Sequence, residues 1–109
     1  MTLTELYQSS LRKLGVLASG ETPQADDLTI CAETYKQLCA EIGIPSFYVP
    51  DGAGTTLAYI MAADLTGDFQ VPEAKTQRLL ATRKGYKRDV QRLLAEEYDT
   101  DTVIEANYF

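Results

Sequence analysis

Residues 11–27 carry the signals for the end of one helix and the start of another. Arg12 and Lys13 are cations suited to the last turn of a helix, where they face its carbonyl end. Gly15 suits the left-handed residue that follows a helix C-terminus, and Gly20 permits a second sharp bend. These signals predict two helices joined by a short loop, which commits this part of the chain to a helical fold.

The second of these helices has its own start signal. Thr22 is a good N-cap, and Pro23 suits the first helical position because the N–H that it lacks has no partner there anyway. Asp26 and Asp27 follow in the first turn, on the favourable side of the helix dipole. The pattern predicts a helix over about residues 23–42.

Apolar residues at helical spacing predict two more helices around this pair. One covers about residues 4–14, and Thr2 with Glu5 has the form of a capping box at its start. Another covers about residues 56–66 and is apolar around most of its girth, which predicts an element buried on several sides. The stretch 43–55 is rich in glycine and proline, and is the longest predicted loop.

The last helix is expected over residues 73–97, with Gly85 marking a bend or a close contact. Its predicted apolar face consists of Leu79, Leu80, Tyr86, Val90, Leu93 and Leu94. The stretch 98–109 ends in β-branched and aromatic residues, so we expect an extended tail rather than a helix. The expected fold class is all-α: a small bundle of about four helices with an extended C-terminal tail. We divide the chain into a helical domain, residues 1–97, and the tail, residues 98–109.

Charge is segregated along the chain, whose net charge is −6. Seven of the ten basic residues lie between residues 75 and 92, whereas residues 96–109 hold five acidic residues and no basic one. A basic helix suits nucleic acid, a solvated helix face, or an acidic protein surface such as the acidic end of an adjacent copy. The residues predicted to make electrostatic contacts between copies or with a partner are Lys84, Lys87, Arg88, Arg92, Glu96, Glu97, Asp99 and Asp101.

The chain lacks the residue sets that catalysis requires. It has no histidine, no phosphate-binding glycine motif, and only two cysteines. Cys31 and Cys39 are eight residues apart on one predicted helix, about 12 Å between Cα atoms, which is too far for a disulfide. We expect two buried, reduced thiols, no enzyme activity, no cofactor and no metal site. No apolar stretch reaches the length of a membrane span, so no membrane partner is expected.

The run LRKLGVLASGETPQADD, residues 11–27, resembles the head-to-tail connector (adaptor, or head-completion) proteins of tailed bacteriophages. Members of that family often open with a helix, a Leu-Gly-Val-like turn, a Gly-Glu-Thr-Pro-like bend and a long second helix. The likeness is strongest over residues 6–42. It implies a small, mostly helical structural protein that assembles as a ring, usually of twelve copies, between the portal and the tail. Such a ring extends the DNA channel and helps to retain the packaged genome.

The resemblance also implies partners and a place in the virion. The expected partners are the portal protein, the tail or next connector protein, and other copies of the chain, which would enclose double-stranded DNA without sequence-specific binding. The protein would be made in the host cytoplasm and reside at the head–tail junction. C-terminal segments of such proteins commonly reach the portal, so Val103 and Ile104 are expected to add there as a strand, with Tyr108 and Phe109 as anchors. The alternative interpretation of the tail is a frayed terminus. The alternative function for the whole chain is a small DNA-binding regulator that uses the basic fourth helix.

Overall fold

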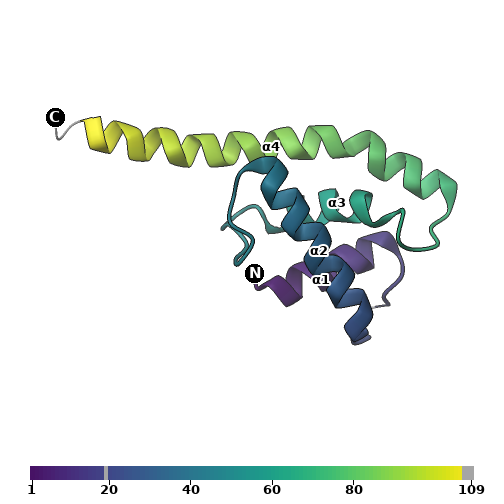
Figure 1. Ribbon diagram of the computed structural model, residues 1–109. Coiled ribbons are helices and arrows are strands. Elements are labelled where there is room, and N and C mark those ends of the chain that lie inside the picture. The colour runs from purple at the N-terminus through teal and green to yellow at the C-terminus, as the bar shows by residue number, and fades with distance from the viewer. Residues whose placement is uncertain (19, 107–109) are drawn as a thin grey trace.

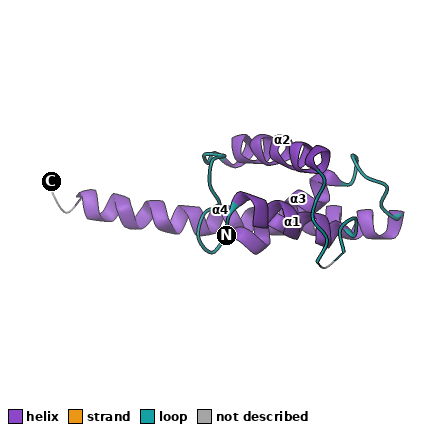
Figure 2. Cartoon of the chain, turned by 90° about the horizontal axis from the view of Figure 1, so that it is seen from below, coloured by secondary structure: helices purple, strands orange, loops and turns teal. Residues whose placement is uncertain are grey.

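Four helices follow one another along the chain (Figure 1). The computed structural model describes residues 1–18 and 20–106, with side chains described up to Ala95. The helices are α1 (Leu3–Leu14), α2 (Ala25–Ile42), α3 (Gly54–Leu65) and α4 (Glu73–Ala106). Throughout these described ranges the regular structure is helical, with loops between (Figure 2). The expected all-α fold with four helices is therefore confirmed.

Both ends of α1 follow their predicted signals. The Thr2 hydroxyl accepts a hydrogen bond from the Glu5 backbone N–H, and the Thr2 N–H donates to the Glu5 carboxylate, each at 3.1 Å. This is the predicted capping box, which satisfies two otherwise unpaired donors. Gly15 ends the helix in the left-handed conformation, at φ 90°, and its N–H donates to the carbonyls of Leu11 and Arg12.

The start of α2 differs from the prediction. The helix begins at Ala25, and Gln24 rather than Thr22 occupies the N-cap, in an extended conformation and without a side-chain capping bond. Pro23 is buried, so it packs at the edge of the core before the chain turns into the helix. Asp27 still lies in the first turn, so the favourable interaction of acidic residues with the helix dipole is retained.

Helix α3 is the central element of the bundle, as its sequence predicts. It packs against each of the other three helices, most extensively against α4 and α1. Leu57, Ile60, Met61 and Leu65 are completely buried. Each side chain of this kind stabilises the fold by about 1.5–3 kcal/mol relative to an exposed position. Because α3 is packed on several sides, most positions around this helix are apolar in the sequence.

Helix α4 packs one face on the core, but the predicted face is wrong at one position. Leu80 is 51% exposed, whereas Leu79 packs against the core. Leu79 lies two helical turns before Tyr86 and so faces the same side, whereas Leu80 is rotated about 100° from Leu79. Of the two expectations for Gly85, the close contact is not found: the helix continues through this residue, and a Cβ added there would meet nothing within 4 Å.

The C-terminal segment extends beyond the bundle, as predicted, but its backbone conformation differs from the prediction. Figure 1 shows α4 leaving the other helices and continuing alone, and the helix runs to Ala106. The expectation of non-helical backbone from residue 98 onward is therefore wrong up to that point. The sequence contains no stop signal there, because no glycine or proline follows Gly85 before Ala106.

Candidate functional site

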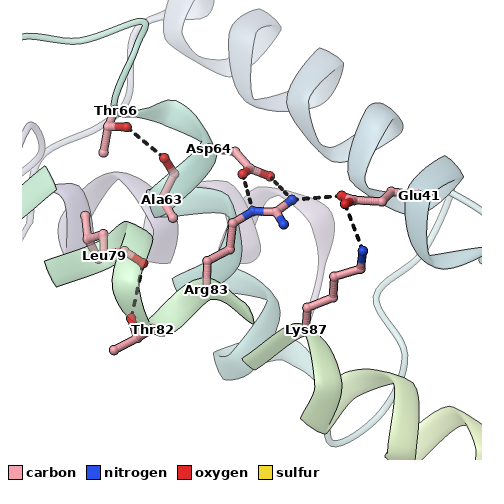
Figure 3. A network of polar contacts seen from close by, with 8 residues as sticks. All are labelled: Glu41, Ala63, Asp64, Thr66, Leu79, Thr82, Arg83 and Lys87. Atoms are coloured by element: carbon pink, nitrogen blue, oxygen red, sulfur yellow. Dashed lines mark hydrogen bonds and ion pairs between the residues drawn. The ribbon is translucent and has the colours of Figure 1, made fainter. Parts of the chain in front are cut away.

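A network of ion pairs joins three of the helices (Figure 3). Arg83 on α4 donates from Nε to one oxygen of Asp64 on α3 at 2.5 Å, and from a terminal nitrogen to the other oxygen at 3.2 Å. The same terminal nitrogen donates to Glu41 on α2 at 2.8 Å. A planar guanidinium suits this fork geometry, which a lysine could not reproduce. Arg83 therefore fixes α4 relative to α2 and α3.

Lys87 extends this network by one helical turn. Its Nζ donates to the other carboxylate oxygen of Glu41 at 2.9 Å. Hydrogen bonds from Arg83 and Lys87 lower the pKa of Glu41 to about 2, and the Arg83 pKa is raised in turn, mainly by its bonds to Asp64. Glu41 and Arg83 are therefore both charged at neutral pH, so their ion pair is present there.

The network changes the role expected for the basic stripe on α4, which consists of Lys84, Lys87, Arg88 and Arg92. Lys87 is paired with Glu41, whereas Lys84, Arg88 and Arg92 are exposed. Arg83, which is not among the residues predicted to make electrostatic contacts, makes most of the polar contacts between helices in this network. A signal for this was available, because Glu41 and Asp64 are acids near the C-terminal ends of α2 and α3, where the helix dipole disfavours them. A cation from another element would therefore stabilise each of these acids.

A polar groove of about 330 Å³ lies beside the network. It is lined by Thr34, Gln37, Leu38, Glu41, Asp64, Asp68 and Arg83. Its central carboxylates are already bonded to Arg83, and its lining contains no thiol or imidazole that could serve as a nucleophile or base. The described residues hold no group of three or more side chains that could bind a metal ion. Arg83 thus already binds two of the carboxylates that line this groove.

A second surface combines cations with aromatic rings. The rings of Tyr59 on α3 and Tyr86 on α4 stack with centroids 5.0 Å apart and planes 9° apart. Lys13 on α1 places its Nζ 4.5 Å from the centroid of the Tyr59 ring, a cation–π contact. Lys75 and Arg78 line a groove of about 260 Å³ beside the two rings. We call Lys13, Tyr59, Lys75, Arg78 and Tyr86 the basic tyrosine surface.

The loop between α2 and α3 presents two aromatic side chains to solvent. Phe47 is 78% exposed and Tyr48 is 42% exposed, with ring centroids 5.1 Å apart. The base of the loop is fixed, because the buried Tyr35 donates its hydroxyl proton to the Tyr48 carbonyl at 2.8 Å. Within the predicted loop, residues 50–53 form a turn, with Gly52 at φ 81° and the Ala53 N–H donating to the Pro50 carbonyl at 3.2 Å. Exposed aromatic residues on a fixed loop are typical of protein contacts.

The two cysteines are free and buried, as predicted. Burial raises the pKa of the Cys31 thiol to about 11 and also raises that of Cys39. The thiolate is the reactive form of cysteine, so neither residue has the environment of a nucleophile. In the described part of the chain, every helix is too short or too polar to cross a membrane.

The remaining predicted contact residues lie at the end of α4 or beyond it. Tyr108 and Phe109 lie outside the described residues, as do the side chains of Glu96, Glu97, Asp99, Asp101, Val103 and Ile104. The backbone at residues 103–104 is helical, so pairing there as an added strand requires unwinding of the helix. The sequence reasoning did not identify the basic tyrosine surface as a unit, because its residues come from three helices.

No protein-family model, curated protein or solved structure matches this chain. Its function is therefore inferred from its residues and their arrangement.

Proposed function

We propose that this protein is a head-to-tail connector of a tailed bacteriophage. It would form a ring, of twelve copies, between portal and tail, extend the DNA channel and help to retain the packaged genome without catalysing a reaction. The proposal is supported by the resemblance of residues 11–27 to that family. The structural observation that carries it is the helix α4, which leaves a small bundle as a long arm (Figure 1).

The length of α4 favours a partner for the arm. The helix has 34 residues and is therefore about 51 Å long. Its contacts with the core reach Leu94, and it then continues to Ala106. Short helices without tertiary contacts are marginal in water. A helix–groove contact with the portal would stabilise this arm, and residues 103–109 would supply its apolar and aromatic anchors.

The aromatic loop offers a second contact in the same assembly. A connector needs one surface for the portal and another for the tail or the next ring. Phe47 and Tyr48 are suited to the second surface, since they are exposed while Tyr35 fixes the backbone beneath them. Large aromatic side chains often contribute most of the binding energy at such contacts.

A DNA-binding regulator remains the competing proposal, and the exposed cations on α4 favour it. Lys84, Arg88 and Arg92 are available on the outer face of that helix. However, Lys87 is held by Glu41, which interrupts the stripe. A regulator of this kind would bind short duplex DNA with a strong dependence on salt concentration. A connector would enclose DNA while allowing it to slide.

Electron microscopy of the purified protein, with and without the portal complex of the same phage, tests the proposal. We expect rings on the portal with the complete chain and none, or far fewer, after deletion of residues 99–109. Phe47→Ser is the matched control, which should still bind the portal but lose the tail-side partner. An absence of rings on the portal, together with salt-sensitive binding of monomers to duplex DNA, would favour the regulator instead.

A further inference from the structure

The cations of the basic tyrosine surface form no ion pair with the described side chains of the bundle. Among the described side chains, ion pairs are made by Arg83 and Lys87, whereas Lys13, Lys75 and Arg78 make none. The groove at this surface is lined by Tyr59, Lys75, Arg78, Leu79, Thr82 and Tyr86, with no acidic residue among them. A ligand for this surface is therefore anionic.

The arrangement of these side chains is constrained by several contacts. Lys75 places its Nζ against Gly15, at the C-terminal end of α1, so close that a Cβ at residue 15 would lie 2.7 Å from it. Lys13 is held over the Tyr59 ring, and that ring stacks on Tyr86. Cations and rings from α1, α3 and α4 are thus already placed side by side, which lowers the entropic cost of binding.

We propose that this surface binds the acidic end of α4, residues 96–105, from a second copy of the chain. That segment holds Glu96, Glu97, Asp99, Asp101 and Glu105 without any basic residue, so its charge is complementary to the surface. Tyr98 within it supplies an aromatic ring of the kind that packs on stacked tyrosines.

The contact cannot form within one copy. Arg78 and Asp99 both belong to α4, and 21 helical residues separate them by about 31 Å. The protein measures 54 × 27 × 22 Å, and α4 carries its acidic end away from the bundle (Figure 1). A contact between two such different surfaces is head-to-tail, and repetition of it gives a closed ring or a filament. The inference rests on the proposed function, because it names the contact that would join neighbouring copies in that ring.

Charge exchange in the complete chain tests this contact. In Lys75→Glu/Arg78→Glu the surface becomes acidic, and in Glu97→Lys/Asp99→Lys/Asp101→Lys the end of α4 becomes basic. Association is measured by sedimentation and by NMR shifts of Tyr59, Lys75, Arg78 and Tyr86, up to about 1 mM protein in low salt. We expect the wild type to associate, and each variant alone to do so at least about tenfold more weakly. An equimolar mixture of the two variants should recover association, because each then offers the other a complementary partner.

One control variant and one competing ligand, a DNA duplex, complete the test. Lys84→Glu/Arg88→Glu reverses the same number of charges on the exposed face of α4. The sequence placed both residues among the expected contacts with a copy or partner, whereas the contact proposed here does not use them, so association should be unchanged. A loss of association in that control, or no association of the wild type at about 1 mM, overturns the proposal. Failure of the mixture to recover association also overturns it. Shifts at the surface caused by a short DNA duplex, without self-association, would assign the surface to nucleic acid.

The same variants separate this proposal from the proposed function. If the mixture recovers association but no ring forms on the portal, the contact is correct and the connector function fails. If all variants form normal rings on the portal, the connector function holds and this contact is wrong.

Discussion

Arg83 on α4 donates hydrogen bonds to both carboxylate oxygens of Asp64 on α3. Asp64 is the only charged residue of α3 and lies in its last turn, where the helix dipole disfavours an acid. The side chains of both residues are 23% exposed, so each would lose solvation without the other. The pair therefore fixes the position of α4 on the central helix, and with it the direction of the protruding arm.

Replacement of Arg83 by methionine should lower the free energy of unfolding by about 2 kcal/mol. The change keeps most of the side-chain volume but leaves the partly buried Asp64 carboxylate without its cation. Urea unfolding followed by circular dichroism at 222 nm measures the effect. Arg88→Met removes the same charge at an exposed site and should change stability by less than about 0.5 kcal/mol. Equal effects of the two substitutions would contradict a specific role for Arg83.

Stability should also fall in acid through Glu41. Hydrogen bonds from Arg83 and Lys87 lower the pKa of this carboxyl to about 2, from 4.5. A carboxyl whose pKa is lower in the folded state stabilises the fold above its unfolded pKa. That contribution is lost as the pH falls from about 4.5 to about 2. Because the side chain is 40% exposed, solvent screens the interaction and the loss should be about 1 kcal/mol.

The measurement is the difference in unfolding free energy between the wild type and Glu41→Gln. It should be largest at neutral pH and shrink across that acid range. A difference that stays constant from pH 6 to pH 2 would show that the Glu41 charge does not stabilise the fold.

The sequence was most informative where local backbone chemistry decides the structure. The capping box at Thr2, the left-handed Gly15 and the apolar girth of α3 each depend on residues within a few positions, and each is confirmed. The sequence was less informative where the structure depends on which residues are buried. Pro23 is drawn into the core, which moves the start of α2 beyond Thr22. At residue 80 the predicted face was drawn too wide, because Leu79 but not Leu80 is at helical spacing with Tyr86, Val90 and Leu93.

The interaction sites were harder to predict because their residues are distant in sequence. Arg83 and Glu41 are 42 residues apart, and the stacked Tyr59 and Tyr86 belong to different helices. Only the packing of α2 and α4 on α3 brings these groups together. The charge pattern correctly indicated that α4 is basic, but it could not show that Lys87 forms an ion pair with Glu41 within the bundle.

Two glycine substitutions should have opposite effects. Gly15→Ala should destabilise the protein by about 1 kcal/mol, because residue 15 has φ 90°, which a residue with a Cβ adopts only with strain. Gly85→Ala should stabilise it by about 0.5–1 kcal/mol, because residue 85 is helical and its surroundings are open. Thermal unfolding of both variants measures the difference. A destabilising Gly85→Ala would show that Gly85 serves a purpose that the bundle alone does not explain.

Removal of one hydroxyl should loosen the aromatic loop without disturbing the core. Tyr35 is completely buried and donates its hydroxyl proton to the Tyr48 carbonyl at 2.8 Å. In Tyr35→Phe the ring still fills its site, but the carbonyl loses its partner, so stability should fall by about 1 kcal/mol. Backbone order parameters from ¹⁵N relaxation should decrease at residues 46–49 and remain unchanged in α3. Tyr48→Phe is the matched control, because it removes an exposed hydroxyl and leaves the carbonyl bond intact. If Tyr35→Phe leaves the loop as ordered as this control does, another contact fixes the position of Phe47.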